Sequence, residues 1–488
     1  MALTRRLVRA CALPHFAVAS LRREGWLQLG IPVRSTLPPQ MSEHEFPDQA
    51  VCTLAPWKHL LTVPNTIECP SMKIVSAGSE DPVFSGSGQI NIRSRTHMDF
   101  LMHAVPRNGG EAFKRIGRAR ENPYNIHDQL GVRATQYDGT EWNAGWTTVH
   151  LGDTLGDTWR LSGPIHSLLT DASRLDIAPT SSIEVIYDSR LRVPLPLNMS
   201  TSIRRGGKEV LRRFERGGAT IDIAGTRIDF LMDPEVDATW AVAATSEDFP
   251  HPYAENWVSE PLSLLLGQPV FPRLVARNFG DRSIVWVRPS SDIKSHTFAA
   301  SILQEDPLAA DNRFWEVYRR ILTMMVRARD EDGNRNFEAH PLSQYYHEVI
   351  QATRGSDWVW CLALASAIEG VTKLLTPENE RRSDYAPEAI DELKDHINAW
   401  HGDAVLRARV MSSVAYAGTK GVGQILRKFK DEGLIADGHV DAWVAVRNHV
   451  MHGELMSPWS HQELEGRMHL LAELMHRLSM RYVEEHSS

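Results

Sequence analysis

The chain has 488 residues, 42% hydrophobic and 23% charged, with a formal net charge of -8 at pH 7. This length predicts two or three domains, and the acidic balance argues against a protein that coats nucleic acid over its whole surface. The four cysteines form no C-x-x-C pair, which fits a reducing compartment such as the cytoplasm and offers no zinc site, and no apolar run is long enough for a transmembrane helix.

We expect residues 1–45 to form a tail and linker outside the folded domains. The segment before Glu24 contains five arginines and no acidic residue, which is typical of a mitochondrial-type presequence. Arg9 interrupts the apolar run that a secretory signal would need. A wrongly assigned upstream start codon or a poorly ordered extension gives the same pattern, and the linker-like stretch 36–50, TLPPQMSEHEFPDQA, favours an extension.

Residues 46–170 and 171–305 are predicted to be β-rich, either as two antiparallel domains or as one that continues through both. Short runs of β-branched and aromatic residues recur between Gly, Pro, Asp and Asn. The clearest runs are QINIR (89–93), TTVHL (147–151), SIEVIYD (182–188) and SIVWVRP (283–289). The stretch 219–233 predicts a hairpin that turns near Ala224 and Gly225.

Three segments of this β-rich half have a different pattern. Residues 111–120 and 260–267 predict short helices. The stretch 203–218, IRRGGKEVLRRFERGG, is strongly basic and allows two interpretations. It either contacts an RNA backbone or forms a solvated helix with glycines at its ends, and we expect the helix.

After Pro307 the sequence has a helical pattern throughout, and we predict an all-α bundle over residues 310–488. Apolar residues recur at helical spacing in the stretches 312–331, 342–354, 357–375, 387–401, 403–415, 420–433, 438–452 and 461–485. The third stretch is apolar nearly all round, so we expect it to be the buried central helix. The expected fold class is therefore multidomain α+β, with a β-rich region before a C-terminal helical bundle.

The stretch DAWVAVRNHVMHGEL (441–455) carries the candidate catalytic residues Arg447, Asn448 and His452. A histidine has an unperturbed pKa near 6.5 and can move a proton at neutral pH, while a guanidinium suits phosphate oxygens. A metal-free ribonuclease needs both groups. In an ideal helix the arginine and the histidine lie about 140° apart, so a wide groove or a departure near Gly453 is required. The alternative is an ordinary helix end, with a surface arginine and with a histidine near the negative, C-terminal end of the helix dipole.

The same Arg-x4-His spacing occurs at Arg335–His340 and at Arg481–His486. The first pair lies in a polar loop before Pro341, where we expect nothing to fix the side chains. The second pair lies in the last residues of the chain, where we expect the helix to fray. Context therefore favours the pair in 447–452.

Other motifs have ordinary interpretations. The glycine-rich stretch 418–428 with Lys420 could hold a phosphate, but it lacks the P-loop spacing and we expect a plain helix start. His347 and Glu348 do not match H-E-x-x-H, so we expect a surface helix and no metal site. Trp400 and Trp443 are expected to be core or groove-wall residues.

The helical third resembles a HEPN domain. The family signature is Arg-x(4–6)-His near the end of an all-α bundle, with Asn or an acidic residue commonly after the arginine, and RNHVMHG (447–453) is similar to it. The apolar stretch WCLALASAIEGVTKLL (360–375) resembles the first helix of such domains. A β-rich half before the bundle is similar to the ApeA-like bacterial anti-phage HEPN proteins, most clearly in the stretch 84–104.

The resemblance implies a metal-independent, dimeric endoribonuclease without cofactors. His452 would be the general acid or base, Arg447 would stabilise the charged transition state, and Asn448 would orient the phosphate or the histidine. His449 is a spare titratable group nearby. Implied partners are an RNA substrate, a second copy bound through the helical bundle and a trigger of phage origin, with no membrane. The alternative is a catalytically silent HEPN-like module for dimerisation or RNA binding.

Overall fold

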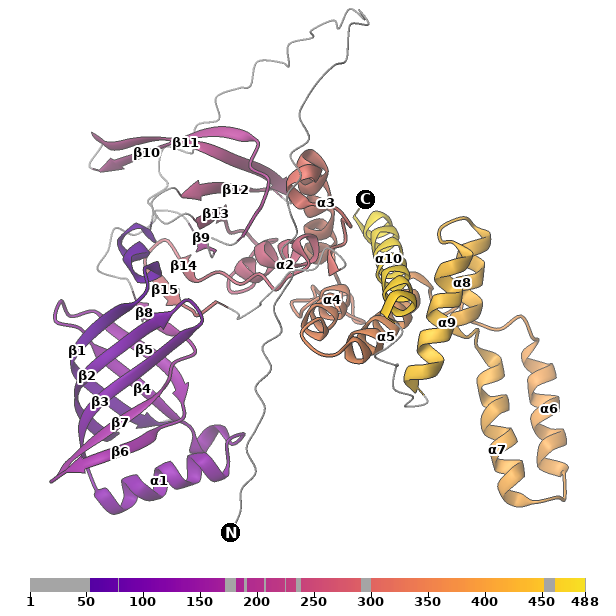
Figure 1. Cartoon of the computed structure of the whole chain (residues 1–488), viewed down its shortest axis with the longest axis horizontal. Coiled ribbons are helices and arrows are strands. Elements are labelled where there is room, and N and C mark those ends of the chain that lie inside the picture. Colours follow the sequence, from indigo (N-terminus) through magenta and orange to yellow (C-terminus); the bar gives the residue numbers. More distant parts are fainter. Residues whose placement is uncertain are drawn as a thin grey trace, which may run out of the picture. The chain divides into compact units, whose positions relative to one another are not determined.

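The computed structural model describes most of the chain after its N-terminal segment (Figure 1). The described residues are 53–77, 79–171, 181–187, 191–205, 208–223, 225–233, 238–290, 300–451 and 461–487. The predicted tail, residues 1–45, lies outside this part, and so does His452.

Fifteen strands in the described ranges form a single antiparallel sheet (Figure 1). They are β1 (Asn65–Ser76), β2 (Pro82–Ser94), β3 (His97–Pro106), β4 (Leu130–Thr135), β5 (Glu141–Thr147), β6 (His150–Leu155), β7 (Thr158–Pro164), β8 (Leu168–Asp171), β9 (Ser182–Ile186), β10 (Leu197–Arg205), β11 (Lys208–Ile223), β12 (Thr226–Asp233), β13 (Ala238–Ala244), β14 (Leu274–Asn278) and β15 (Ser283–Val287). Their order is β10-β11-β12-β13-β9-β14-β15-β8-β5-β4-β1-β2-β3-β7-β6. The strands of both predicted β-rich regions are therefore hydrogen-bonded in one continuous order.

The sheet contributes buried side chains to two hydrophobic clusters. One cluster takes buried side chains from β1 to β5, β7 and β8, from the 3-10 helix η1 (Ala55–Leu61) and the helix α1 (Gly109–Glu121), and also from β9 and β12 to β15. Strands β9, β11, β12 and β13 share the other cluster with α2 (Ala254–Leu266) and the C-terminal helices. The second cluster joins the sheet to the helical region, because packed apolar side chains of both lie in one core.

Two glycines allow β2 and β3 to pair closely. A Cβ atom at Gly86 would lie 2.0 Å from the carbonyl oxygen of His103, and one at Gly88 would lie 2.1 Å from that of Leu101. These contacts are with backbone atoms, which cannot move aside as a flexible side chain can. The glycines of FSGSGQ (84–89) therefore mark a close approach of two strands.

A buried ionic cluster fastens α2 to the sheet. The carboxylate of Glu255 is 2% exposed and accepts hydrogen bonds from Arg277 Nε at 2.6 Å and from Arg288 Nη2 at 2.9 Å. The Arg277 guanidinium also lies 4.1 Å from the ring centroid of Trp286. A buried carboxylate needs such partners, because its desolvation is otherwise very costly.

The C-terminal region is helical, which confirms the expected α+β class at this coarse level. Its helices are α3 (Pro307–Arg327), α4 (Pro341–Ala352), α5 (Asp357–Leu375), α6 (Pro387–Ala399), α7 (Ala404–Ala415), α8 (Val422–Asp431), α9 (Asp437–Met451) and α10 (His461–His486), with the 3-10 turn η4 (Tyr416–Gly418) between α7 and α8. Each predicted helix is present within a few residues of its expected bounds. The sequence pattern thus located this region well.

The helix α5 is the central helix that its apolar composition predicted. It contacts α4, α8, α9 and α10, and its residues Cys361, Leu364 and Ile368 are fully buried. By length and composition alone α5 could cross a membrane, a test that core helices also pass. Its contacts with four helices identify it here as a core helix.

Two local predictions were wrong. The run 147–151 is not one strand, because β5 ends at Thr147 and β6 begins at His150, where the chain changes its partners from β4 and β8 to β7. The basic stretch 203–218 is not a helix but most of the β10–β11 hairpin. The stretch pairs across this hairpin, and β11 from Gly218 onward pairs with β12, so strand pairing outweighs local helical preference.

Candidate functional site

The apolar face of α9 holds the candidate residues in place. Val440, Trp443 and Val446 recur at helical spacing and are buried, and α9 packs against α5, α8 and α10. The indole Nε1 of Trp443 donates a hydrogen bond to the carbonyl oxygen of Ala365 in α5, at 3.3 Å. The last turns of α9 are therefore anchored to the central helix.

Arg447 and Asn448 lie next to each other on the exposed side of α9. The Arg447 guanidinium carbon lies 5.9 Å from the ring centroid of Trp443, one turn earlier. Among the residues with described side chains, no carboxylate forms an ion pair with Arg447. The structure thus brings Arg447 and Asn448 together, while His452 lies outside the described residues and His449 is exposed.

A second arginine lies near the same tryptophan and was missed by the sequence reasoning. A Cβ atom at Gly423 in α8 would lie 3.6 Å from the Trp443 ring and 3.9 Å from Nη1 of Arg427. Arg427 is exposed and belongs to α8, which packs against α9. Arg427 therefore belongs to the stretch of α8 that lies against Trp443.

A cavity of about 400 Å³ adjoins Arg427 along α8. Its wall includes both signs of charge, and two of its lysines are already paired, Lys420 with Asp384 at 2.6 Å and Lys428 with Glu380 at 3.2 Å. Gly421 precedes α8, and its backbone N–H donates to Gln424 Oε1 at 3.0 Å. The glycine-rich stretch 418–428 is therefore a plain helix start, as expected.

The Arg335–His340 pair is fixed, contrary to our expectation. Arg335 donates hydrogen bonds to the carbonyl oxygen of Glu247 and to the carboxylate of Asp248. His340 is buried, and its Nδ1 accepts a hydrogen bond from the backbone N–H of Leu342 at 3.1 Å, which caps α4. Both side chains have structural roles, since capping satisfies a backbone donor that a helix end leaves free.

This cap predicts acid sensitivity. Burial, with a smaller contribution from the charge of His486, lowers the pKa of His340 from 6.5 to about 4. In the unfolded chain this histidine binds a proton below about pH 6.5, whereas in the folded chain it stays neutral down to about pH 4. We expect stability to fall by up to about 3 kcal/mol across this window. Urea titrations at pH 7 and pH 4.5 should show a smaller loss in His340→Asn, which keeps a cap but does not titrate; an equal loss would refute this role.

The pair at 481–486 also differs from its prediction. Helix α10 continues to His486, whose ring stacks on Tyr482 with centroids 4.0 Å apart. Arg481 pairs with Glu485 at 2.6 Å. These contacts hold the last turn, so neither side chain frays as we expected.

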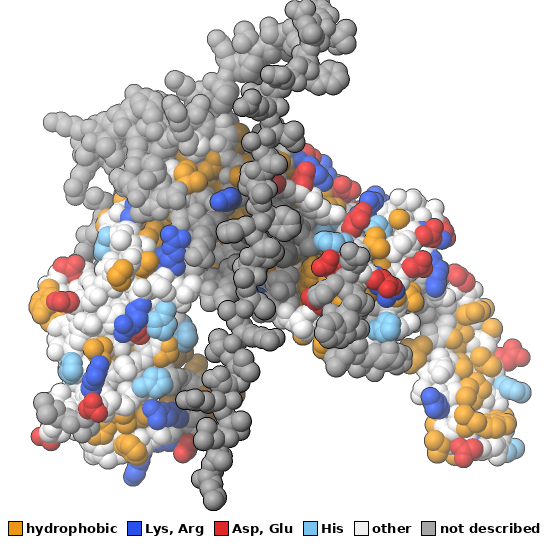
Figure 2. Space-filling view, in the orientation of Figure 1, with side chains coloured by type: hydrophobic (Ala, Val, Ile, Leu, Met, Phe, Trp, Pro, Cys, Tyr) orange, Lys and Arg blue, Asp and Glu red, His pale blue; other side chains and the backbone are white. Residues whose placement is uncertain are grey.

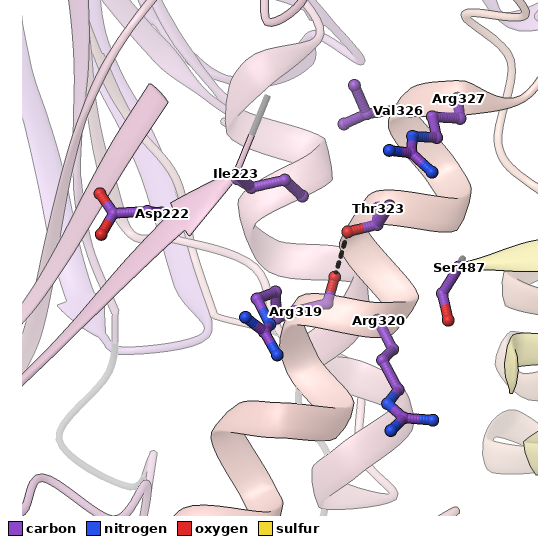
Figure 3. A pocket seen from close by; sticks show the side chains of 8 residues that line it. All are labelled: Asp222, Ile223, Arg319, Arg320, Thr323, Val326, Arg327 and Ser487. Carbon is purple, nitrogen blue, oxygen red and sulfur yellow. Dashed lines mark hydrogen bonds between the residues drawn. The ribbon is translucent and has the colours of Figure 1, made fainter. Parts of the chain in front are cut away.

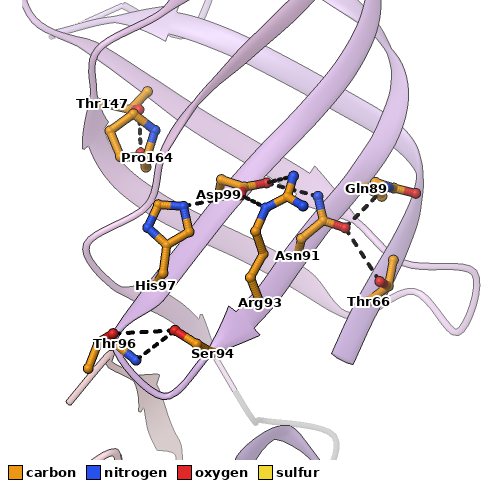
Figure 4. A network of polar contacts seen from close by, with 10 residues as sticks. All are labelled: Thr66, Gln89, Asn91, Arg93, Ser94, Thr96, His97, Asp99, Thr147 and Pro164. Atoms are coloured by element: carbon orange, nitrogen blue, oxygen red, sulfur yellow. Dashed lines mark hydrogen bonds and ion pairs between the residues drawn. The ribbon is translucent and has the colours of Figure 1, made fainter. Parts of the chain in front are cut away.

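The contacts of two further polar groupings are explained by structural roles. On β2 and β3, Asp99 accepts hydrogen bonds from Arg93 and Asn91 and lies 3.4 Å from His97 (Figure 4). Burial alone would raise the pKa of Asp99, but these hydrogen bonds outweigh it and lower the pKa. Among the residues drawn with it, no hydroxyl contacts the His97 ring, so the cluster has no evident nucleophile.

The other grouping lines a cavity of about 440 Å³ that includes residues of β11 and α3 (Figure 3). Arg319, Arg320 and Arg327 of α3 contribute to its wall. Arg320 already pairs with Glu316 at 2.6 Å, and arginines near the end of a helix also stabilise its dipole. Their charge alone therefore does not indicate a ligand.

The described residues include no group of three or more His, Cys, Asp or Glu side chains that could hold a metal ion. His347 and Glu348 lie on α4, in agreement with the expected helix. Comparison of the chain with family models, curated proteins and solved structures found no match.

Proposed function

We propose that this chain is a metal-independent endoribonuclease that cleaves RNA with Arg447, Asn448 and His452. The observation that carries the proposal is the exposure of Arg447 and Asn448 together, on a helix end that Trp443 anchors to the core. An exposed arginine without a described carboxylate partner is available to an anion. Arg427 on the neighbouring helix α8 is a second exposed cation, and cations suit the phosphate backbone of RNA.

The proposed reaction needs no group beyond these side chains and the RNA. The 2′-hydroxyl attacks the adjacent phosphorus and the bond to the 5′-oxygen breaks, which leaves a 2′,3′-cyclic phosphate and a 5′-hydroxyl. His452 takes or gives the proton. Arg447 stabilises the extra negative charge of the transition state, and Asn448 orients the phosphate or the histidine by hydrogen bonding.

One histidine in each chain is few for both proton transfers. Two copies related by a two-fold axis would supply a general base and a general acid together. We therefore propose a cytoplasmic homodimer formed through the helical region, whose sequence resembles a HEPN domain. The N-terminal sheet then acts as a sensor or restraint, released by a phage-derived trigger in an abortive anti-phage response.

Growth of cells that overexpress the protein tests this function. Wild type should slow growth and fragment cellular RNA, while His452→Ala should do neither at equal protein level. As a matched control, His486→Ala alters the same spacing elsewhere and should behave as wild type. The same comparison is made during phage infection, which supplies the trigger. If all three strains then grow equally and keep their RNA intact, the catalytically silent module is favoured instead.

A further inference from the structure

The helices α6 and α7 form a hairpin that is closed at its base by backbone pairing. Arg382 and Thr419 form a β-bridge, and the backbone N–H of Ser383 donates to the carbonyl oxygen of Gly418 at 3.0 Å. The two helices pack against each other and against η4. None of the described side chains in either helix is buried, so the hairpin has no core of its own.

On α6, the apolar side chains extend beyond the face that α7 covers. Ile390 and Ile397 are partly buried, whereas Leu393 is 46% exposed and Trp400, just after the helix, is 44% exposed. At 100° per residue, the exposed pair lies about 60° around the helix from the isoleucines. Of the two roles expected for Trp400, core or groove wall, its 44% exposure excludes the core.

On α7 the same arrangement recurs. Met411 and Val414 are partly buried, whereas Leu406 is 50% and Val410 39% exposed on the adjacent flank. Because the two helices are antiparallel, the exposed flanks of α6 and α7 open on the same side of the hairpin. We call Leu393, Trp400, Leu406 and Val410 the hairpin strip. Figure 2 shows hydrophobic side chains gathered over these two helices.

Opposite charges border the hairpin strip. Helical periodicity places Glu392 at its outer edge on α6 and Arg409 at its outer edge on α7. Neither side chain has an ion-pair partner among the described residues. Arg407, in contrast, donates to the carbonyl oxygen of Trp400 at 2.9 Å and so closes the loop between the helices. An apolar strip with one acidic and one basic edge can complement a second copy of itself.

We infer that the hairpin strip is the interface of a homodimer, in which α6 packs against α7 of the partner subunit. Two hairpins then form a four-helix arrangement that buries both strips. With a two-fold axis parallel to the helices, Glu392 faces Arg409 of the partner subunit on both edges. An axis perpendicular to the helices would instead place like charges together, so the charges select the first arrangement. The inference gives a surface for the homodimer of the proposed function, but the evidence for this surface does not depend on cleavage.

The mass of the full chain in solution tests this interface. Sedimentation equilibrium should give a dimer for wild type and a monomer for Val410→Asp. The matched control is Val405→Asp, because Val405 is 79% exposed but lies on the other side of α7, and this variant should stay dimeric. Glu392→Arg and Arg409→Glu should each raise the dissociation constant about tenfold, the effect of two weak edge pairs. The double variant should return to within about threefold of wild type, since the pair is only reversed.

A monomeric wild type at all concentrations would overturn the inference. So would a dimer that Val410→Asp leaves intact, or a charge reversal that fails to restore association. RNA cleavage is measured separately in the same samples. A dimer that stays inactive with lysate from phage-infected cells added would refute the nuclease and leave the interface, whereas an active monomer would refute the interface and leave the nuclease.

Discussion

Replacing Arg447 with alanine is expected to slow RNA cleavage by a factor on the order of 100 to 1,000, the usual loss when one donor to a developing charge is removed. The fold should survive, because Arg447 is exposed and its helix is held by the buried Trp443. Single-turnover rates on a short RNA, with circular dichroism of the same samples, measure both effects.

A lysine at this position sharpens the test. Arg447→Lys keeps the charge but loses the planar fork that binds two phosphate oxygens, so we expect an intermediate rate. Arg481→Ala serves as the control, because Arg481 begins an Arg-x4-His sequence in α10 and pairs with Glu485. Equal rates for the wild type and both Arg447 variants would remove this residue from the mechanism.

Replacing Glu255 with alanine is expected to cost about 3 kcal/mol of stability, because two arginines lose the buried carboxylate that neutralises them. Arg277 and Arg288 keep some access to water, with 18% and 26% of their side chains exposed, so we expect the lower end of the usual range. Guanidinium unfolding, followed by fluorescence, should show the midpoint move to lower denaturant.

An exposed ion pair provides the contrast. Glu80, between β1 and β2, pairs with Arg133 of β4, and 83% of the Glu80 side chain is exposed. Glu80→Ala should leave the midpoint unchanged, because water replaces the partner at little cost. If both alanine variants moved the midpoint equally, burial of Glu255 would not be the cause of its effect.

The helical region was largely predictable from the sequence because apolar periodicity and helix length agree there. The stretch 357–375 was expected to be the central helix from its composition alone, and α5 has those same bounds. The hairpin at 219–233 was equally clear, with Gly225 in a left-handed conformation at the turn. Local signals suffice where neighbouring residues along the chain make the contacts.

The remaining features depend on partners that are distant in sequence. The basic stretch 203–218 lies in the β10–β11 hairpin, whose strand β11 continues into the sheet through β12, β13 and β9. Arg427 could not be linked to Arg447 before α8 was packed on α9. The fixation of Arg335 by Asp248 likewise joins two segments that lie 87 residues apart. No periodicity within a single segment contains such information.

Cleavage of RNA by the purified full chain in excess EDTA tests the central claim most directly. The wild-type protein should yield fragments with 2′,3′-cyclic phosphate and 5′-hydroxyl ends. If it needs its trigger, a nuclease-depleted lysate of phage-infected cells is added. His452→Ala should yield none under the same conditions. Fragments with the same ends and rate from His452→Ala, or cleavage by wild type that EDTA abolishes, would contradict the account.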